Sequence, residues 1–255
     1  MLETQENILP QNLEIWQNTL AWQPTQEQQD YLQKLYQKVL FGNQQFNLTR
    51  ITEPQEFWEK HLWDSLAGIL KIPVNLEKNS TIIDIGSGAG FPGIPTAIVR
   101  PDWMVSLLDS TQKKVNFLNS VIEDLSLKNA NTLLGRAEVI GKTKAYKASY
   151  DIALIRAVAN AAICAEYSLP LLKSGGIAVL YRGNWTEEET ESLSVVLDIL
   201  GGKVEKIESF STPISQSIRH CIYLKKITNS SKLKAYQINC KSKTNPGKTS
   251  SPDKD

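Results

Sequence analysis

The pattern of apolar and polar positions divides the chain near residue 73. Before that point, apolar residues recur at spacings of three and four, the period of a helix with one buried face. From Ser80 onward, short β-branched runs alternate with amphipathic segments, which is typical of βαβ units around a mostly parallel sheet. The pattern therefore predicts a helical cap over residues 1–72 and an α/β domain over residues 73–227.

Three helices are predicted in the cap. The first is short and covers residues 13–20. A capping box, in which a Thr and the Gln three residues later bond the free N–H groups, opens the second helix at Thr25, and we expect it to end at residues 41–43. The same spacing at Thr52 predicts a second capping box and a third helix, which ends at Pro73.

The α/β part predicts seven strands and four helices. The expected strands are Thr81–Ile85, Met104–Asp109, Asn131–Leu134, Asp151–Ile155, Ile177–Tyr181, Val204–Ser209 and Arg219–Lys225, and the expected helices are Gly93–Val99, Ser110–Leu125, Ala161–Leu172 and Thr186–Leu200. No helical pattern separates the last two strands, so they should form an antiparallel hairpin. This total predicts a Rossmann-like α/β fold with five parallel strands and a terminal hairpin.

The numbers of charged, Cys and His residues limit which partners the chain can bind. Lys and Arg total 28 and Asp and Glu total 27, but residues 228–255 alone carry six Lys and two Asp. Any surface for a polyanion must therefore be a local patch, with a basic tail that we expect to be unstructured. Three Cys without a CxxC pair and only two His leave no expected metal site. With no leader pattern and no run of about 18 apolar residues, we expect a cytoplasmic protein.

The sharpest local feature is a glycine-rich segment after the first strand. Four glycines fall within eight positions, from Gly86 to Gly93, and a helix follows. Glycines let the backbone turn tightly and approach a ligand at the end of the sheet. The next strand ends in Asp109, placed to accept hydrogen bonds from a ribose diol. Together these features predict a nucleoside site, although a glycine-rich turn without a ligand remains the alternative.

Charge helps to decide which nucleoside is bound. Asp84 would repel the pyrophosphate of a dinucleotide, which lies against the helix N-terminus. S-adenosyl-L-methionine has no phosphate and carries an ammonium that an acid at the end of the first strand would suit. The antiparallel terminal strand also favours a methyltransferase, so NAD binding is the weaker interpretation.

Seven short segments together resemble the RsmG (GidB) family between about Phe46 and Lys226. They are Asn47-Leu-Thr49, His61-Leu-Trp-Asp-Ser65, Asp84-Ile-Gly-Ser-Gly-Ala-Gly-Phe-Pro-Gly-Ile-Pro95, Leu108-Asp-Ser-Thr-Gln-Lys-Lys114, Arg136-Ala-Glu138, Arg156-Ala-Val-Ala159 and Arg219-His220. The resemblance implies a class I S-adenosylmethionine-dependent methyltransferase that modifies N7 of a guanine in the 530 loop of 16S ribosomal RNA. The tail from Ser230 keeps lysines but departs from the Gly- and Pro-punctuated basic stretch common in the family.

The resemblance also implies roles for individual residues. Gly86 and Phe91 would line the cofactor, Asp109 with Ser110 and Thr111 would hold the ribose, Ala137 and Glu138 would flank the adenine, and Arg156 would lie between cofactor and substrate. Independently, ligands of an open α/β sheet bind beyond the carboxyl ends of the strands, where Gly86, Asp109 and Arg156 are expected.

Methylation at guanine N7 requires few catalytic groups. The nitrogen attacks with a lone pair and releases no proton, so the main requirement is alignment at near-attack distance. The sequence has neither the Asn/Asp-Pro-Pro-Tyr run used for exocyclic amines nor a Pro-Cys pair for pyrimidine attack. Apolar neighbours favour a packed thiol at Cys164 over a nucleophile.

His61, Asp64 and Ser65 share one helical face, and two interpretations stay open. They could form a polar network that holds the cap on the sheet, or His61 or Asp64 could meet the guanine or the RNA backbone. A hydrolase triad is disfavoured because the three lie within one turn. Arg156 follows an apolar run, where a charge is costly unless it is paired or faces a ligand. It is the candidate catalytic residue with His61 and Asp64, the alternative being a structural ion pair with Asp84 or Glu138.

The expected partner is 16S ribosomal RNA or a small-subunit particle, bound by a monomer. Phosphate contacts are expected from Arg50, Lys113, Lys114, Arg136, Lys142, Lys144, Lys147, Arg182, Arg219 and His220, although the three loop lysines from 142 to 147 fit a solvated loop as well. Two rival functions remain: methylation of a small molecule under a helical lid, and a redox or non-catalytic nucleotide-binding protein.

Overall fold

The computed structural model describes residues 7–73 and 77–227. One seven-stranded sheet has the order β3-β2-β1-β4-β5-β7-β6. Its strands are β1 Thr81–Ile85, β2 Met104–Asp109, β3 Ala130–Leu134, β4 Tyr150–Arg156, β5 Leu172–Arg182, β6 Gly202–Ser211 and β7 Ile218–Lys226. Strands β1 to β5 pair in parallel, and β7 runs antiparallel between β5 and β6. This confirms the predicted fold, including the terminal hairpin.

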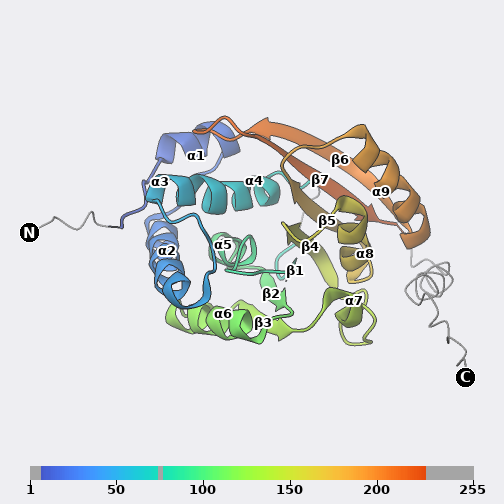
Figure 1. The fold of residues 1–255 in the computed structure, drawn as a ribbon, viewed down its shortest axis with the longest axis horizontal. Helices are drawn as coiled ribbons and strands as arrows, with labels where there is room; N and C mark the ends of the chain where they lie inside the picture. Colours follow the sequence, from blue (N-terminus) through green and yellow to red (C-terminus); the bar gives the residue numbers. More distant parts are fainter. Residues whose placement is uncertain (1–6, 74–76, 228–255) are drawn as a thin grey trace, which may run out of the picture.

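Helices cover both faces of the sheet (Figure 1). They are α1 Leu13–Leu20, α2 Gln26–Phe46, α3 Pro54–Phe57, the π-helix η1 Trp58–Trp63, α4 Asp64–Leu70, α5 Gly93–Val99, α6 Gln112–Asp124, α7 Ala137–Ile140, α8 Ala161–Ser168 and α9 Glu187–Leu200. Helices α2, α4, α5 and α6 lie on one side, and α7, α8 and α9 on the other.

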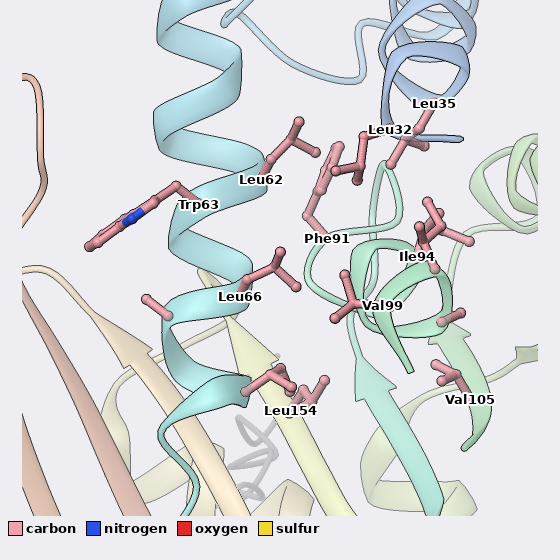
Figure 2. Packing of buried hydrophobic residues seen from close by; sticks show 14 of the residues in the cluster. Leu32, Leu35, Leu62, Trp63, Leu66, Phe91, Ile94, Val99, Val105 and Leu154 are labelled. Atoms are coloured by element: carbon pink, nitrogen blue, oxygen red, sulfur yellow. The ribbon is translucent and has the colours of Figure 1, made fainter. Parts of the chain in front are cut away.

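The alternating direction of side chains along each strand explains why the sheet has one hydrophobic core on each face. In β1, Ile82 belongs to the core shared with the N-terminal helices and Ile83 to the core under α8 and α9. Successive side chains of a strand point to opposite faces, so a strand covered on both sides is mostly apolar. In the first core, Leu62 and Leu66 point toward the α2 residue Leu32 and the glycine-loop residue Phe91 (Figure 2). The N-terminal helices and the sheet are therefore packed around common side chains.

The second helix is longer than its sequence predicts. It runs to Phe46, past the residues 41–43 that were expected to end it, and its C-cap is Asn47. Gly42 is buried, and a Cβ at this position would lie 2.4 Å from the ring of Phe117. The glycine therefore allows α2 and α6 to pack closely and does not end the helix.

The predicted capping box at Thr52 is wrong, whereas the one at Thr25 is confirmed. The N-cap of α3 is Glu53, with no side-chain cap bond, and Pro54 occupies the first turn. Proline needs no N–H partner there and its φ suits a helix, which outweighs the Thr-x-x-Gln spacing. From Pro54 the helix continues through η1 and α4 to Leu70, and the π-helical turn was not predicted.

Two boundaries in the second half also differ. Helix α8 ends at Ser168, four residues before the expected end, and β5 begins at Leu172, because the Pro170 ring lacks the N–H that would continue the helix. The short helix α7 was not predicted. The basic tail, residues 228–255, lies outside the described residues. Within the described part of the chain, no helix is long and apolar enough to cross a membrane.

Candidate active site at the carboxyl ends of the strands

The glycine loop begins directly after β1 and turns over β2. The N–H groups of Gly86 and Ser87 both donate to the Leu108 carbonyl, at 2.7 and 3.0 Å. Gly86, Gly88 and Gly90 have φ of 71°, 58° and 98°, values that side-chain-bearing residues rarely adopt. The glycine-rich segment therefore shapes the end of the sheet, as its sequence predicts.

A cavity of about 300 Å³ lies beside this loop. Six predicted cofactor residues line it: Gly86, Asp109, Ser110, Thr111, Ala137 and Glu138. Lys114 and Arg136, expected to contact phosphates, also line it. The remaining lining residues were not predicted as site residues and are Ile85, Leu108, Gly135, Ala157, Val158 and Tyr167. Tyr167 comes from α8, far along the chain, and no local pattern distinguishes it from a core aromatic residue.

Asp109 is fixed in the cavity wall by backbone donors. Its Oδ2 accepts from Gly88 N at 3.0 Å and its Oδ1 from Thr111 N at 2.9 Å. The residue is 5% exposed, and Lys114 Nζ lies 3.8 Å from Oδ2. A carboxylate has about four lone-pair sites, so these two bonds leave acceptor capacity for a diol.

The remaining predicted residues form a second cluster beside the cavity. Arg156, at the end of β4, donates from Nη1 to the Lys60 carbonyl at 2.9 Å and to Asp64 Oδ2 at 3.0 Å. Its Nη2 lies 3.3 Å from His61 Nδ1. The ion pair of Arg156 is therefore with Asp64, and the predicted alternative of Asp84 or Glu138 is wrong.

His61 is held between the cap and the glycine loop. Its ring stacks on Phe91, with centroids 4.5 Å apart and an interplanar angle of 11°. Burial, followed by the positive charges of Arg156 and Lys60, lowers the pKa of His61 to about 3. The ring is therefore neutral at physiological pH. Ser65 donates to the His61 carbonyl within the same helix, and the contacts of Arg156 with His61 and Asp64 form the polar network between cap and sheet.

Asp84 lies beneath the loop and does not line the cavity. It is fully buried, and its Oδ2 accepts from Gly93 N at 2.9 Å. Its Oδ1 has no hydrogen-bond partner among the residues the structure describes. Burial raises the pKa of Asp84 to about 7, while the Gly93 hydrogen bond and the charge of Arg156 oppose the rise.

The predicted phosphate-binding residues are differently placed. Arg219 Nε lies 3.7 Å from Asp64 Oδ1, so this side chain joins the Arg156 cluster. Arg182 pairs with Glu189 and donates to the Ala159 carbonyl, so its guanidinium is used in contacts within the protein. Arg136 is largely exposed at the cavity rim, 3.7 Å from Glu138. No group of three or more potential metal ligands occurs within residues 7–73 and 77–227.

Comparison with known proteins identifies the family. The family model described as GidB, rRNA small subunit methyltransferase G, matches residues 28–222. The chain belongs to the GidB family. A ribosomal RNA small subunit methyltransferase G from Nostoc punctiforme is 58% identical over 223 residues, covering 87% of this chain and 91% of that relative. The match spans the loop, the cavity and the Arg156 cluster of this GidB family member.

Solved structures support the fold at low identity. The pre-rRNA processing protein fibrillarin of Methanococcus jannaschii has a TM-score of 0.50 and 16% identity, covering 64% of this chain and 75% of that chain. The [4+2]-cyclase SpnF has a TM-score of 0.54 and 14% identity, covering 80% and 97%. Proteins with different reactions share this fold, so the chemistry must be argued from the site.

Proposed function

We propose that this chain transfers the methyl group of S-adenosyl-L-methionine to N7 of a guanine in the 530 loop of 16S ribosomal RNA. The observation that carries the proposal is the juxtaposition of the Asp109 cavity and the Arg156 cluster at one end of the sheet, in a member of the GidB family. A ribosomal substrate implies a cytoplasmic enzyme, and we expect it to act as a monomer.

The residues of the cavity fit this cofactor. Gly88 combines a φ of 58° with open space, because a Cβ there would have only the Gly86 carbonyl within 4 Å, at 3.8 Å. A ligand can therefore approach the backbone closely at this point. Asp109 retains acceptor capacity for the ribose, and Ala137 with Glu138 would hold the adenine. Asp84, with its unpaired Oδ1 and a pKa of about 7, is partly ionised at neutral pH, and a bound ammonium nearby would favour its charged form.

When bound, the cofactor supplies an electrophilic methyl group on a sulfonium. The guanine N7 lone pair needs no base, so the chain has to orient the purine and exclude water. His61 agrees with this requirement, because a ring with a pKa of about 3 whose Nδ1 faces Arg156 is not placed to take a proton from the substrate.

We assign to Arg156 the role of orienting the purine. Of its five N–H donors, three are directed at Lys60, Asp64 and His61. One Nη2 hydrogen and the Nε hydrogen have no hydrogen-bond partner in the described part of the chain. These two donors can bind guanine O6, next to N7, and leave the N7 lone pair free. The charge of Asp64 offsets the repulsion between the guanidinium and the sulfonium.

Two measurements test the proposal. Calorimetry should detect binding of S-adenosylmethionine and its demethylated product but none of NAD(H), and tight NAD binding would exclude a methyltransferase. Labelled methyl from the cofactor should then appear in 16S ribosomal RNA or in small-subunit particles. Label that appears in small molecules but never in RNA would support the rival small-molecule function.

A further inference from the structure

Thr49 lies in the loop between α2 and α3 and contacts the half-buried His61. Its Oγ1 lies 2.9 Å from His61 Nε2 and accepts from the Ile51 N–H at 3.0 Å. The Thr49 N–H donates to Asn43 Oδ1 at 2.9 Å. The bond to Asn43 therefore fixes Thr49 against the last turns of α2, and the bond to His61 reaches the Arg156 cluster.

The donors around His61 decide its tautomer. The Arg156 guanidinium stays protonated in proteins and has only donors, so Nδ1 must act as the acceptor of the Nη2 hydrogen. A neutral ring then carries its proton on Nε2, and this N–H donates to Thr49 Oγ1. The opposite tautomer would place two N–H groups against each other at Nδ1, and only the hydroxyl hydrogen of Thr49 could then satisfy Nε2.

We propose that Thr49 is a positioning residue that holds His61 in the Nε2–H tautomer and thereby orients Arg156. The kinetic part of this inference rests on the proposed methyl transfer. Thr49 touches neither the cavity nor Arg156 and acts through the His61 ring. The backbone carbonyl of Lys60 and the carboxylate of Asp64 hold the Nη1 end of the same guanidinium, so the histidine controls only its Nη2 end.

The ring also connects the cap to the glycine loop. His61 stacks on Phe91 at 4.5 Å, and the Arg156 guanidinium lies 5.7 Å from the centroid of that ring. The π-helix η1 contains both Lys60 and His61, and π-helical turns occur often at functional sites. A His61 ring that is not held in place would therefore disturb both the Arg156 guanidinium and the Phe91 ring beside it.

Histidine nitrogen NMR tests the tautomer directly, because the full chain has only two histidines, His61 and His220. In ¹⁵N-histidine-labelled protein, a His220→Gln variant assigns the signals. We expect His61 to show a protonated Nε2 and an unprotonated Nδ1 from about pH 5 to 8. A protonated Nδ1, or a ring that titrates in this range, would overturn the proposal whatever the enzyme methylates.

Variants of Thr49 test its role. Thr49→Ser keeps the acceptor and should preserve the His61 spectrum and kcat within about threefold. Thr49→Val removes it, and we expect a second tautomer or a titrating ring, with kcat lower by at least about tenfold and the Kd for S-adenosylmethionine changed by less than about threefold. Thr132→Val on β3 is the matched control, since the Thr132 hydroxyl donates to Asn119 Oδ1, outside the site.

The outcomes separate the two proposals. An unchanged His61 spectrum with unchanged kcat in folded Thr49→Val would contradict the positioning role. A lower Tm in Thr49→Val without any change in the His61 signals would assign Thr49 a purely structural role. If the wild-type chain transfers no methyl group but shows the expected tautomer and its loss in Thr49→Val, only the proposed function fails.

Discussion

Asp84 and His61 should make opposite contributions to the pH dependence of folding. The pKa of Asp84 is raised from 3.8 to about 7, and that of His61 is lowered from 6.5 to about 3. Native Asp84 keeps its proton where the unfolded chain has lost it, so its contribution is complete below pH about 4 and is lost as the pH rises to about 7. Native His61 stays neutral where the unfolded chain is protonated, so its contribution is complete above pH about 6.5 and is lost as the pH falls toward about 3.

The magnitude follows from linkage. One bound proton of difference changes the free energy of unfolding by about 1.4 kcal/mol per pH unit. Between about pH 4.5 and 6.5 each group therefore contributes a change of up to about 3 kcal/mol, with opposite signs. In the wild type the two contributions nearly cancel over this range, and single substitutions should reveal them.

The assay is urea denaturation followed by tryptophan fluorescence at a series of pH values, for wild type, Asp84→Asn and His61→Gln. The unfolding free energy of Asp84→Asn minus that of wild type should rise by about 1.4 kcal/mol per pH unit over the range. The corresponding difference for His61→Gln should fall at a similar rate. The assignment of a protonated Asp84 and a neutral His61 would be refuted if both differences were independent of pH, or if both changed with pH in the same direction.

Three further substitutions test separate parts of the site. Gly86→Val places a β-branched residue at a φ of 71° with its Cβ 2.7 Å from Val158, so calorimetry should detect no S-adenosylmethionine binding, and unchanged affinity in a folded variant would contradict the cavity assignment. Arg156→Lys keeps the charge but loses the planar fork, so we expect cofactor affinity within about tenfold and methyl transfer at least about a hundredfold slower, and near-normal turnover would make Arg156 structural. Glu59→Gln weakens the hydrogen bonds that Glu59 Oε1 accepts from Ile214 N and Ser215 N, at 2.6 and 2.9 Å. Urea denaturation should then show a free energy of unfolding lower by about 1–2 kcal/mol. An unchanged free energy would contradict the anchoring of the β6–β7 turn by Glu59.

Local pattern was enough to predict the parts of the fold in which neighbouring residues decide the conformation. Strands β1 and β2 begin and end where expected, because a mostly apolar, β-branched run bounded by polar and turn residues leaves little freedom in register. Gly86 and Asp109 were placed correctly because both follow directly from strand ends. The Asp109 bond to Gly88 is a consequence of that placement.

Tertiary packing decided the features that the sequence did not predict. Gly42 resembles a helix end until the ring of Phe117 is placed against it. The partner of Arg156 is Asp64, 92 residues away in sequence, and no spacing rule connects them. Tyr167 reaches the cavity only because α8 packs against β4, β5 and α7. Contacts between residues this far apart in the sequence can be found only from the three-dimensional structure.

The most direct test of the central claim is to map the methylated atom. The chain is incubated with labelled S-adenosylmethionine and small-subunit particles that lack the modification, and the RNA is then reduced and cleaved with aniline, which cuts at 7-methylguanosine. We expect one cut in the 530 loop of 16S ribosomal RNA, with the label recovered as 7-methylguanosine. Label recovered in a pyrimidine, in an exocyclic amine or outside that loop would contradict it.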